Sequence, residues 1–373
     1  MSFLTLVFKN LLRRPTRSLL TMTGIAVGIA AVVALSSIAW GFQRSWEQAY
    51  AARGTDLIVT RITSRNPLPA PFEESIKGAL LNLPHVQRVS GLLSDMVSIE
   101  DAPTVLVFGW ERDGFLWGHL KLVSGRWPAD DTEKVVVIGT VAAEVLRKSV
   151  GDAIHIENDD FTVCGTFDSA ALVENGAIVM ALRQMQRVME YPGRVNFFNL
   201  KLAPDTTDQQ VEELRQAIKS RLPGYNAFTG GEVAQNNTAI QAAKAMSWAT
   251  SLIALVVGAV GVMNTMLMSV FERTHEIGVL LAIGWKRSRI VRLIVYESIA
   301  VSSVGGIEGI LLGFVAVKLL QITPWIRGKI EGEISLQLFG LALVIALVLG
   351  VLGGLYPAYR GSRLHPSEAL RHE

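Results

Sequence analysis

Long apolar runs alternate along the chain with stretches of mixed polarity. Four of these runs are long enough to cross the hydrocarbon core of a bilayer as helices: residues 18–41, 246–271, 290–320 and 336–357. The first run is longer than the ~7–15-residue apolar core of a signal peptide, and it does not end in the small residues of a cleavage site. We therefore expect a membrane bundle of four transmembrane helices, with the first helix uncleaved.

Residues 42–245 instead show short stretches with the alternation typical of strands, interrupted by helical patterns. Pro71 suits the first turn of one helix, and Thr207 or Asp208 suits the N-cap of another. The predicted strands are 56–62, 104–108, 134–138, 153–156, 161–167, 177–180 and 196–202, and the predicted helices are 72–81, 141–148 and 208–221. This order predicts an α+β domain of two lobes, one inserted in the other, with boundaries near 103–133 and 196.

Charge places these segments on the two sides of the membrane, because cytoplasmic loops carry an excess of Lys and Arg. Residues 1–17, 272–289 and 358–373 are basic, residues 321–335 are balanced, and residues 42–245 carry more acidic than basic side chains. We expect a multi-pass protein of the bacterial inner (cytoplasmic) membrane with both termini in the cytoplasm. Residues 42–245 and the loop 321–335 would then be extracytoplasmic, and residues 1–17 would form an amphipathic helix at the inner surface. Pro357 is predicted to stop the fourth span.

The basic segment 272–289 is too short for a domain, but it contains an apolar helical face. Ile277, Leu280, Leu281 and Gly284 share that face, which predicts a short amphipathic helix at the cytoplasmic surface. We expect this helix to couple the chain to a separate ATPase, with Arg273 and Glu276 making polar contacts at the rim. Ile277, Leu280 and Leu281 would either fill a groove on the ATPase or pack against the spans, and a bulky residue at Gly284 would uncouple hydrolysis from transport.

Small residues in the spans predict close helix packing, because helices in lipid approach one another where side chains are small. Glycines recur at four-residue spacing in three spans: Gly24 and Gly28; Gly305, Gly309 and Gly313; Gly350 and Gly354. A homodimer with eight spans is the expected assembly. Glu308 is the acidic residue expected deep in a span, where it has either a functional role or a polar link between helices.

Motifs for chemistry within the chain are missing. The sequence has no G-x-x-x-x-G-K-[ST] phosphate loop, no G-x-S-x-G and no H-E-x-x-H. Its six histidines lack metal-ligand spacing, and a single cysteine excludes an intrachain disulfide. No basic domain with stacking aromatic residues suggests nucleic acid binding. We expect no catalytic residue, metal or cofactor in this chain.

Three stretches resemble the MacB/FtsX-type permeases of ABC transporters over nearly the whole chain. The segment after the second span matches the family's coupling segment at Glu272, Arg273, Glu276, Ile277, Gly278, Ala282, Gly284 and Arg287, and we include Leu280 and Leu281 in that site. The ending resembles the family's C-terminal signature at Pro357, Ala358, Pro366, Ala369, Leu370 and Arg371. A looser match in the extracytoplasmic domain is carried by Gly125-Arg126 and residues 150–167.

The resemblance implies a dimer of permeases that works with two ATPase subunits, which bind ATP and Mg. It implies mechanotransmission, in which ATP-driven movement of the spans opens or closes the extracytoplasmic domain. The implied function is efflux of amphiphilic small molecules or peptides with a periplasmic adaptor. Lipoprotein or lipid extraction, haem export, and non-exporting regulation of a cell-wall hydrolase remain as alternatives.

Overall fold

The computed structural model describes residues 15–61, 69–99, 104–323 and 335–364. Contacts within the chain divide it into two compact units. The helical unit contains Met1–Ala39, Ala243–Leu319 and Gly332–Glu373, and the sheet unit contains Trp40–Ala242 and Leu320–Glu331. The predicted helix 1–17, the loop 321–335 and the C-terminal signature residues from Pro366 onward lie largely or wholly outside the described residues.

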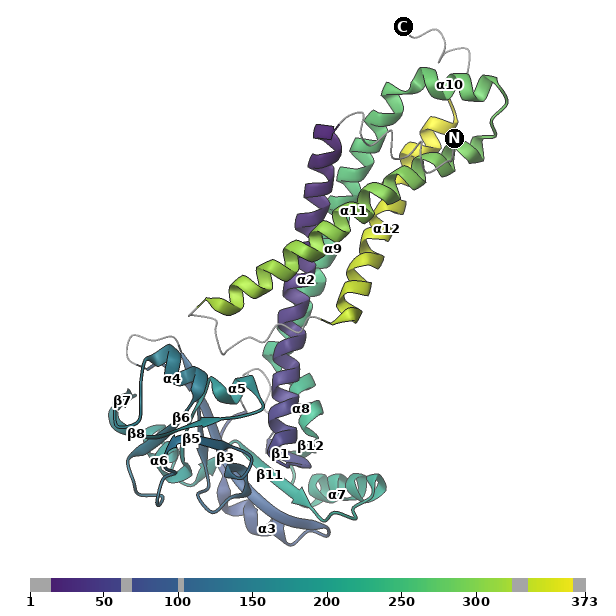
Figure 1. Ribbon diagram of the computed structural model, residues 1–373. Coiled ribbons are helices and arrows are strands. Elements are labelled where there is room, and N and C mark those ends of the chain that lie inside the picture. Colours follow the sequence, from purple (N-terminus) through teal and green to yellow (C-terminus); the bar gives the residue numbers. More distant parts are fainter. Residues whose placement is uncertain (1–14, 62–68, 100–103, 324–334, 365–373) are drawn as a thin grey trace. The chain divides into compact units, whose positions relative to one another are not determined.

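Four helices in the described residues are long and apolar enough to cross a membrane, so this is a membrane protein (Figure 1). They are α2 (Pro15–Ala52), α9 (Thr238–Glu272), α11 (Arg287–Ile322) and α12 (Leu336–Ser362). The short helix α10 (Thr274–Ala282) lies between α9 and α11 along the chain. Each of the four predicted spans falls within one of the long helices.

The helix that contains the first span does not end where the apolar run ends. Polar residues such as Gln43 and Glu47 follow the run, but they prolong the helix, and Gln43 donates a hydrogen bond to Glu47 one turn later at 2.7 Å. Helix α2 therefore continues to Ala52, so that its last residues belong to the sheet unit. The change in hydropathy marked the end of an apolar surface and not the end of the helix.

Pro357 does not stop the fourth span. It lies inside α12, which continues to Ser362, and it is buried. A proline within a helix removes one backbone hydrogen bond, and membrane helices tolerate this loss where neighbouring helices and local adjustments satisfy the freed groups. The prediction failed because the effect of proline on isolated helices was applied to a packed one.

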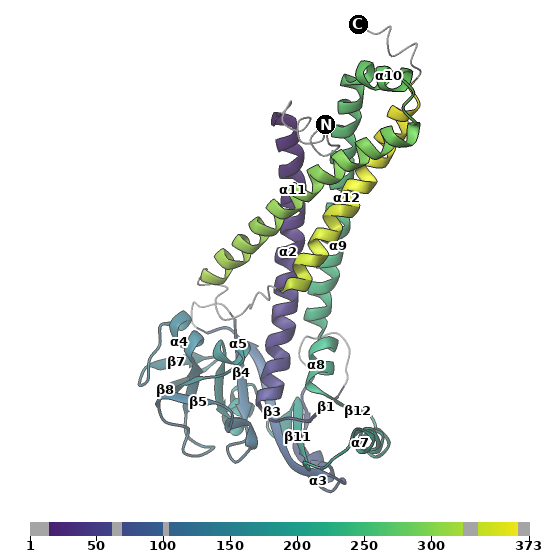
Figure 2. The same ribbon diagram turned by 45° about the vertical axis from the view of Figure 1, so that its right-hand side comes forward.

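The sheet unit is built on a ten-stranded sheet within the described residues (Figures 1 and 2). Its strands are β1 (Leu57–Arg61), β3 (Val86–Val97), β4 (Val105–Trp110), β5 (Lys121–Gly125), β6 (Val135–Gly139), β7 (Ala153–Ile156), β8 (Asp159–Asp168), β9 (Ile178–Ala181), β11 (Phe197–Leu202) and β12 (Tyr225–Phe228). Their order is β12-β1-β11-β3-β4-β9-β6-β8-β5, and β7 pairs with β8. The pairs β4–β9 and β6–β8 are parallel, and the others are antiparallel.

The two predicted lobes are two halves of this one sheet. We call β5 to β9, residues 121–181, the inserted half, and β1, β3, β4, β11 and β12 the framing half. The halves join at the parallel pair of β4 and β9, where Val107 lies opposite Ile178 and Trp110 opposite Ala181. The sequence thus predicted an insertion whose first boundary agrees with the structure, but the inserted half ends at Ala181 and not near residue 196, and it extends the existing sheet.

Helices cover both faces of the sheet. Alternate residues of one strand therefore enter two different cores, one on each face. In β6, Val136 and Ile138 enter one core, whereas Val135 and Val137 enter the other. Strands buried on both faces read as continuous apolar runs. The first core includes residues of α3 (Lys77–Leu81), α4 (Thr140–Leu146), α6 (Leu182–Val188) and α7 (Asp208–Arg221), and the second includes residues of α2, α8 (Gly230–Asn236) and α9.

Local patterns predicted seven of the strands and the helices α4 and α7, but they did not predict β5, β12, α6 or α8. Helix α7 has the predicted bounds, and Thr207 caps it by accepting a hydrogen bond from the backbone of Gln210. The predicted helix 72–81 instead opens with strand β2 (Phe72–Glu73), which pairs with β10 (Arg194–Val195), before the 3-10 turn Glu74–Ile76 and α3. The long strand β3 was missed. The remaining short helix, α5 (Leu172–Asn175), follows β8.

Candidate functional site

Helix α10 has a defined end that fixes the direction of the chain leaving it. The backbone N–H of Trp285 donates to the carbonyl of Leu280 at 3.0 Å, and that of Gly284 donates to the carbonyl of Leu281 at 3.1 Å. This pair of bonds is a Schellman motif, which requires a positive φ at the residue after the cap. Gly284 supplies it with φ +94°, a conformation that glycine adopts easily. Gly284 therefore follows the helix, and its predicted place on the helical face was wrong.

The inner face of α10 packs against the membrane helices. Ile277 is buried in a cluster with Val270 of α9, Ile290 and Ile294 of α11, and Ala358 of α12. Leu280 and Leu281 are partly buried against the same cluster. Of the two arrangements that the sequence left open for these three side chains, the structure shows packing against the spans.

The outer face of α10 carries a different set of apolar side chains. Val279 is 39% exposed and Ile283, which follows the last residue of the helix, is 68% exposed. Glu276 and Ala282 are also exposed, whereas Gly278 is buried. The sequence analysis did not include Val279 and Ile283 in the docking site. It assigned the face with Ile277, Leu280 and Leu281 to a partner, and that face packs on the membrane helices.

A buried ion pair ties the start of α10 to α11. Arg273, the N-cap residue of α10, donates from Nη1 to both carboxylate oxygens of Glu297 at 3.1 and 3.3 Å. The side chain of Glu297 is only 7% exposed and that of Arg273 is 19% exposed. Arg273 was predicted at the rim of the docking face, but its guanidinium is engaged within the bundle. Glu297 was missed because it lies inside an apolar run.

The other predicted coupling residues lie at the ends of neighbouring helices. Glu272 is the last residue of α9 and Arg287 is the first residue of α11, and both are exposed. The segment predicted as one coupling helix is therefore the end of α9, the separate helix α10, a turn and the start of α11. In this arrangement α10 contacts α9, α11 and α12 through packed side chains and α11 through an ion pair.

Glycines bring the membrane helices into close contact. In α11, Gly305, Gly309 and Gly313 face α2, and a Cβ on Gly309 would lie 2.7 Å from the carbonyl oxygen of Ala26. In α12, a Cβ on Gly350 would lie 2.8 Å from Cα of Ile299, and Gly354 is packed against Ser298 in the same way. These five positions are the predicted packing sites.

The first glycine pair is only half right. Gly28 lies against Ala254 of α9, where an added Cβ would be 3.3 Å from Cβ of Ala254. At Gly24, an added Cβ would meet no described atom within 4 Å. Spacing alone does not show which face of a helix has a neighbour.

Glu308 is half-buried in α11. No hydrogen bond or ion pair in the described part of the chain joins its carboxylate to another residue, so the predicted polar link between helices is not seen there. In those same residues, no group of three His, Cys, Asp or Glu side chains could hold a metal ion. Among the described residues, Glu297 of α11 forms a link of this kind, to Arg273 at the start of α10.

The chain is similar to known proteins along nearly its whole length. The model of the MacB-like periplasmic core domain matches residues 18–218, and that of the FtsX-like permease C-terminal region matches residues 248–366. An uncharacterised ABC transporter permease of Methanocaldococcus jannaschii is 27% identical over 99% of this chain and 98% of its own length. The crystal structure of the periplasmic region of MacB from Actinobacillus actinomycetemcomitans is 15% identical, with a TM-score of 0.40 over 49% of this chain and 94% of that chain.

Two other relatives are longer than this chain. The macrolide export ATP-binding/permease protein MacB of Bdellovibrio bacteriovorus is 29% identical over 98% of this chain and 61% of its own length. The pyoverdine export ATP-binding/permease protein PvdT of Pseudomonas fluorescens is 29% identical over 96% of this chain and 57% of its own length. This chain thus spans about three fifths of these two relatives. Because the core-domain model alone matches more than half of the chain, and the permease model follows it over the remaining membrane helices, the chain belongs to the MacB/FtsX family of ABC transporter permeases.

Proposed function

We propose that this chain is the permease subunit of an exporter and that a separate ATP-binding subunit docks on α10. Two copies of the chain would work with two ATP-binding subunits, which hold ATP and Mg²⁺. The protein would lie in a bacterial inner membrane with both termini and α10 in the cytoplasm and the sheet unit outside. Movement of the membrane helices would then change the sheet unit, so that the chain performs no chemistry itself.

One observation carries this proposal: α10 has two faces with different roles. Its inner face is packed on three membrane helices and anchored by the Arg273–Glu297 ion pair, so the helix cannot move alone. Its outer face presents Val279 and Ile283 beside the exposed Glu276. An apolar patch with a charged edge fits a groove that accepts a short helix.

Two features favour export by mechanical coupling over passage through the spans. The glycine contacts hold α11 against α2 and α12 at backbone distance, which suits the transmission of movement between helices. Relatives named for macrolide export and pyoverdine export match nearly all of this chain. We therefore propose amphiphilic small molecules or peptides as the exported class, received outside by a periplasmic adaptor.

The docking face is tested by placing a charge on it. The permease and its cognate ATP-binding subunit are purified together and reconstituted in nanodiscs, and stimulated ATP hydrolysis is measured. Val279→Asp and Ile283→Asp should reduce both complex formation and stimulation, because each buries a charge in an apolar contact. Val123→Asp is the matched control, since Val123 is an exposed valine (57%) in the sheet unit.

The result is decisive in either direction. Loss of the complex in the two α10 variants, with the control unchanged, supports docking on this face. A full complex and full stimulation in both α10 variants would overturn it. An absence of stimulation in the wild-type pair would instead overturn the coupling function itself.

A further inference from the structure

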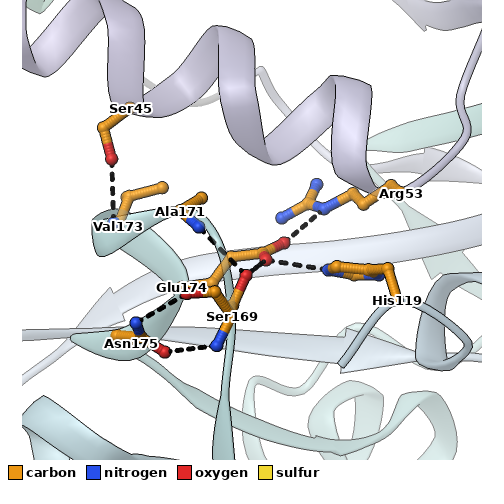
Figure 3. A network of polar contacts seen from close by, with 8 residues as sticks. All are labelled: Ser45, Arg53, His119, Ser169, Ala171, Val173, Glu174 and Asn175. Carbon is orange, nitrogen blue, oxygen red and sulfur yellow. Dashed lines mark hydrogen bonds and ion pairs between the residues drawn. The ribbon is translucent and has the colours of Figure 1, made fainter. Parts of the chain in front are cut away.

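A buried ion pair lies in the sheet unit, at the end of α2. Arg53, the residue after the last residue of α2, donates from Nε to Oε1 of Glu174 in α5 at 2.7 Å. Their side chains are 1% and 0% exposed (Figure 3). The pair joins residues 121 positions apart in the sequence.

The second carboxylate oxygen of Glu174 binds two further side chains. Nε2 of His119 lies 2.8 Å from Oε2, and the hydroxyl of Ser169 donates to the same oxygen (Figure 3). Ser169 follows β8 and Glu174 precedes β9, so both belong to the inserted half. A second contact repeats the link, since the backbone N–H of Val173 in α5 donates to Oγ of Ser45 in α2 at 3.0 Å.

The guanidinium of Arg53 is also held by aromatic rings. Its Cζ lies 5.3 Å from the ring centroid of Tyr50, 5.0 Å from that of Phe108 and 5.4 Å from that of Trp110. Phe108 and Trp110 are residues of β4, which belongs to the framing half. Arg53 thus contacts both halves of the sheet, near the strands β4 and β9 where they join.

This network fixes an orientation in addition to any stability that it provides. Buried ion pairs often stabilise a protein no more than apolar side chains of similar volume would. Nη2 of Arg53, Nε1 of Trp110 and Nδ1 of His119 are buried without a hydrogen-bond partner among the described residues, which adds a cost. Directional hydrogen bonds hold α2 in one fixed orientation relative to α5. Apolar packing alone does not fix that orientation.

We propose that Arg53 and Glu174 are positioning residues that make the inserted half move together with α2. The inference rests on the proposed function, since it concerns how movement of the first span reaches the sheet. Helix α2 is continuous from Pro15 to Ala52, and its residues up to Ala39 belong to the helical unit. It leads directly into β1 of the framing half, whereas among the described residues it is joined to α5 by the hydrogen bonds of Arg53 with Glu174 and of Ser45 with Val173. The ion pair therefore serves as the link to the inserted half.

The test measures whether α2 and the inserted half stay together during ATP turnover. Spin labels are placed at Ala51→Cys in α2 and Thr162→Cys in β8, both exposed positions, in a Cys164→Ala background. Distances are recorded for the full chain with its cognate ATP-binding subunit in nanodiscs, without nucleotide and after trapping with ATP, Mg²⁺ and vanadate. The variants are Glu174→Gln and the double change Arg53→Met with Glu174→Met.

The double change separates positioning from folding, because it leaves no unpaired buried charge and should restore the stability that the single change loses. In wild type we expect one narrow distance in both states. In both variants we expect that distance to broaden on trapping, while ATP hydrolysis is still stimulated. If the double variant regains stability and also the narrow distance, the role is structural and the proposal is overturned.

The single variant keeps the test valid if the double variant does not fold. A narrow distance in both states of Glu174→Gln would also overturn the proposal. Failure of the proposed function gives a different result, since stimulation of ATP hydrolysis would then be missing in the labelled wild-type protein as well.

Discussion

Acidification should weaken the sheet unit through Glu174, and Glu174→Gln isolates the effect because glutamine has the same shape but does not titrate. Burial alone would raise the pKa of the Glu174 carboxyl. The charge of Arg53 and the hydrogen bonds of His119 and Ser169 outweigh burial and lower the pKa from 4.5 to about 2. The ionised form is therefore favoured in the folded state relative to the unfolded state.

The sign and size of the effect follow from this lowered pKa. A group whose pKa is lower in the folded state stabilises the fold above its unfolded pKa, and this contribution is lost as the pH falls towards the folded pKa. This lowering of the Glu174 pKa corresponds to about 3 kcal/mol of stability at pH 7. About half of that contribution is lost by pH 3, and the contribution is constant above about pH 6.

The measurement compares denaturant unfolding of full-length wild type and Glu174→Gln in detergent. Tryptophan fluorescence reports on the sheet unit, since Trp46, Trp110 and Trp117 lie in one of its cores. The difference in unfolding free energy between the two proteins should be flat from pH 7 to pH 6 and should fall by about half at pH 3. Other groups that titrate in both proteins cancel in this difference.

Three results would refute the reasoning. A difference that stays constant down to pH 3 would mean that Glu174 does not ionise differently in the folded and unfolded states. A difference that grows as the pH falls would mean that burial dominates and raises the pKa of Glu174. A variant with wild-type stability at pH 7 would show that the hydrogen bonds of the carboxylate are fully replaced by those of the amide.

Three other substitutions test the helical unit. Gly284→Ala should lower stimulated ATP hydrolysis in the reconstituted pair. A positive φ costs a non-glycine residue about 1 kcal/mol, so the substitution would distort the turn after α10. The control is Gly340→Ala, at an open position of α12, which should have no effect. Gly309→Leu should lower the melting temperature of the purified chain, whereas Gly24→Leu should not, since only Gly309 has a helix backbone within contact distance. Glu297→Ala should destabilise the chain by about 3 kcal/mol in the same melting assay, because it leaves a partly buried arginine unpaired; an unchanged melting temperature would contradict a role for that ion pair.

The parts of the fold that sequence predicted are those fixed by neighbouring residues. The four spans follow from unbroken apolar runs, and strands such as β6 and β7 follow from local composition. Thr207 could be recognised as a cap because its partner is three residues away. The glycines of α11 were also readable, since the stripe of Gly305, Gly309 and Gly313 does lie against α2.

The parts that sequence could not predict depend on distant partners. Strand β3 was missed because it is buried on both faces and contains the buried Ser90 and Ser94, which hide its apolar pattern. Glu297 gave no signal until Arg273 was placed beside it. Arg53 and Glu174 are 121 residues apart, and no spacing rule connects them. Which face of α10 packs on the membrane helices was likewise settled by the cluster around Ile277 and not by the periodicity of the helix.

The continuity of α2 leads to a last prediction about how the two units communicate. The helix runs without interruption from the helical unit through Gly41 into the sheet unit, where Trp46 and Tyr50 enter the core.

Two glycines inserted after Gly41 would each cost the helix about 1 kcal/mol and would allow the chain to bend there, while leaving the residues of both cores intact. We expect both units to stay folded and ATP hydrolysis to remain stimulated, but the nucleotide-dependent change in distance between spin labels on the sheet units of two copies should decrease. The same insertion after Pro223, in an exposed turn, is the control. An undiminished distance change would mean that movement reaches the sheet unit by another route, of which α9, continuous from Thr238 to Glu272, is the first to test.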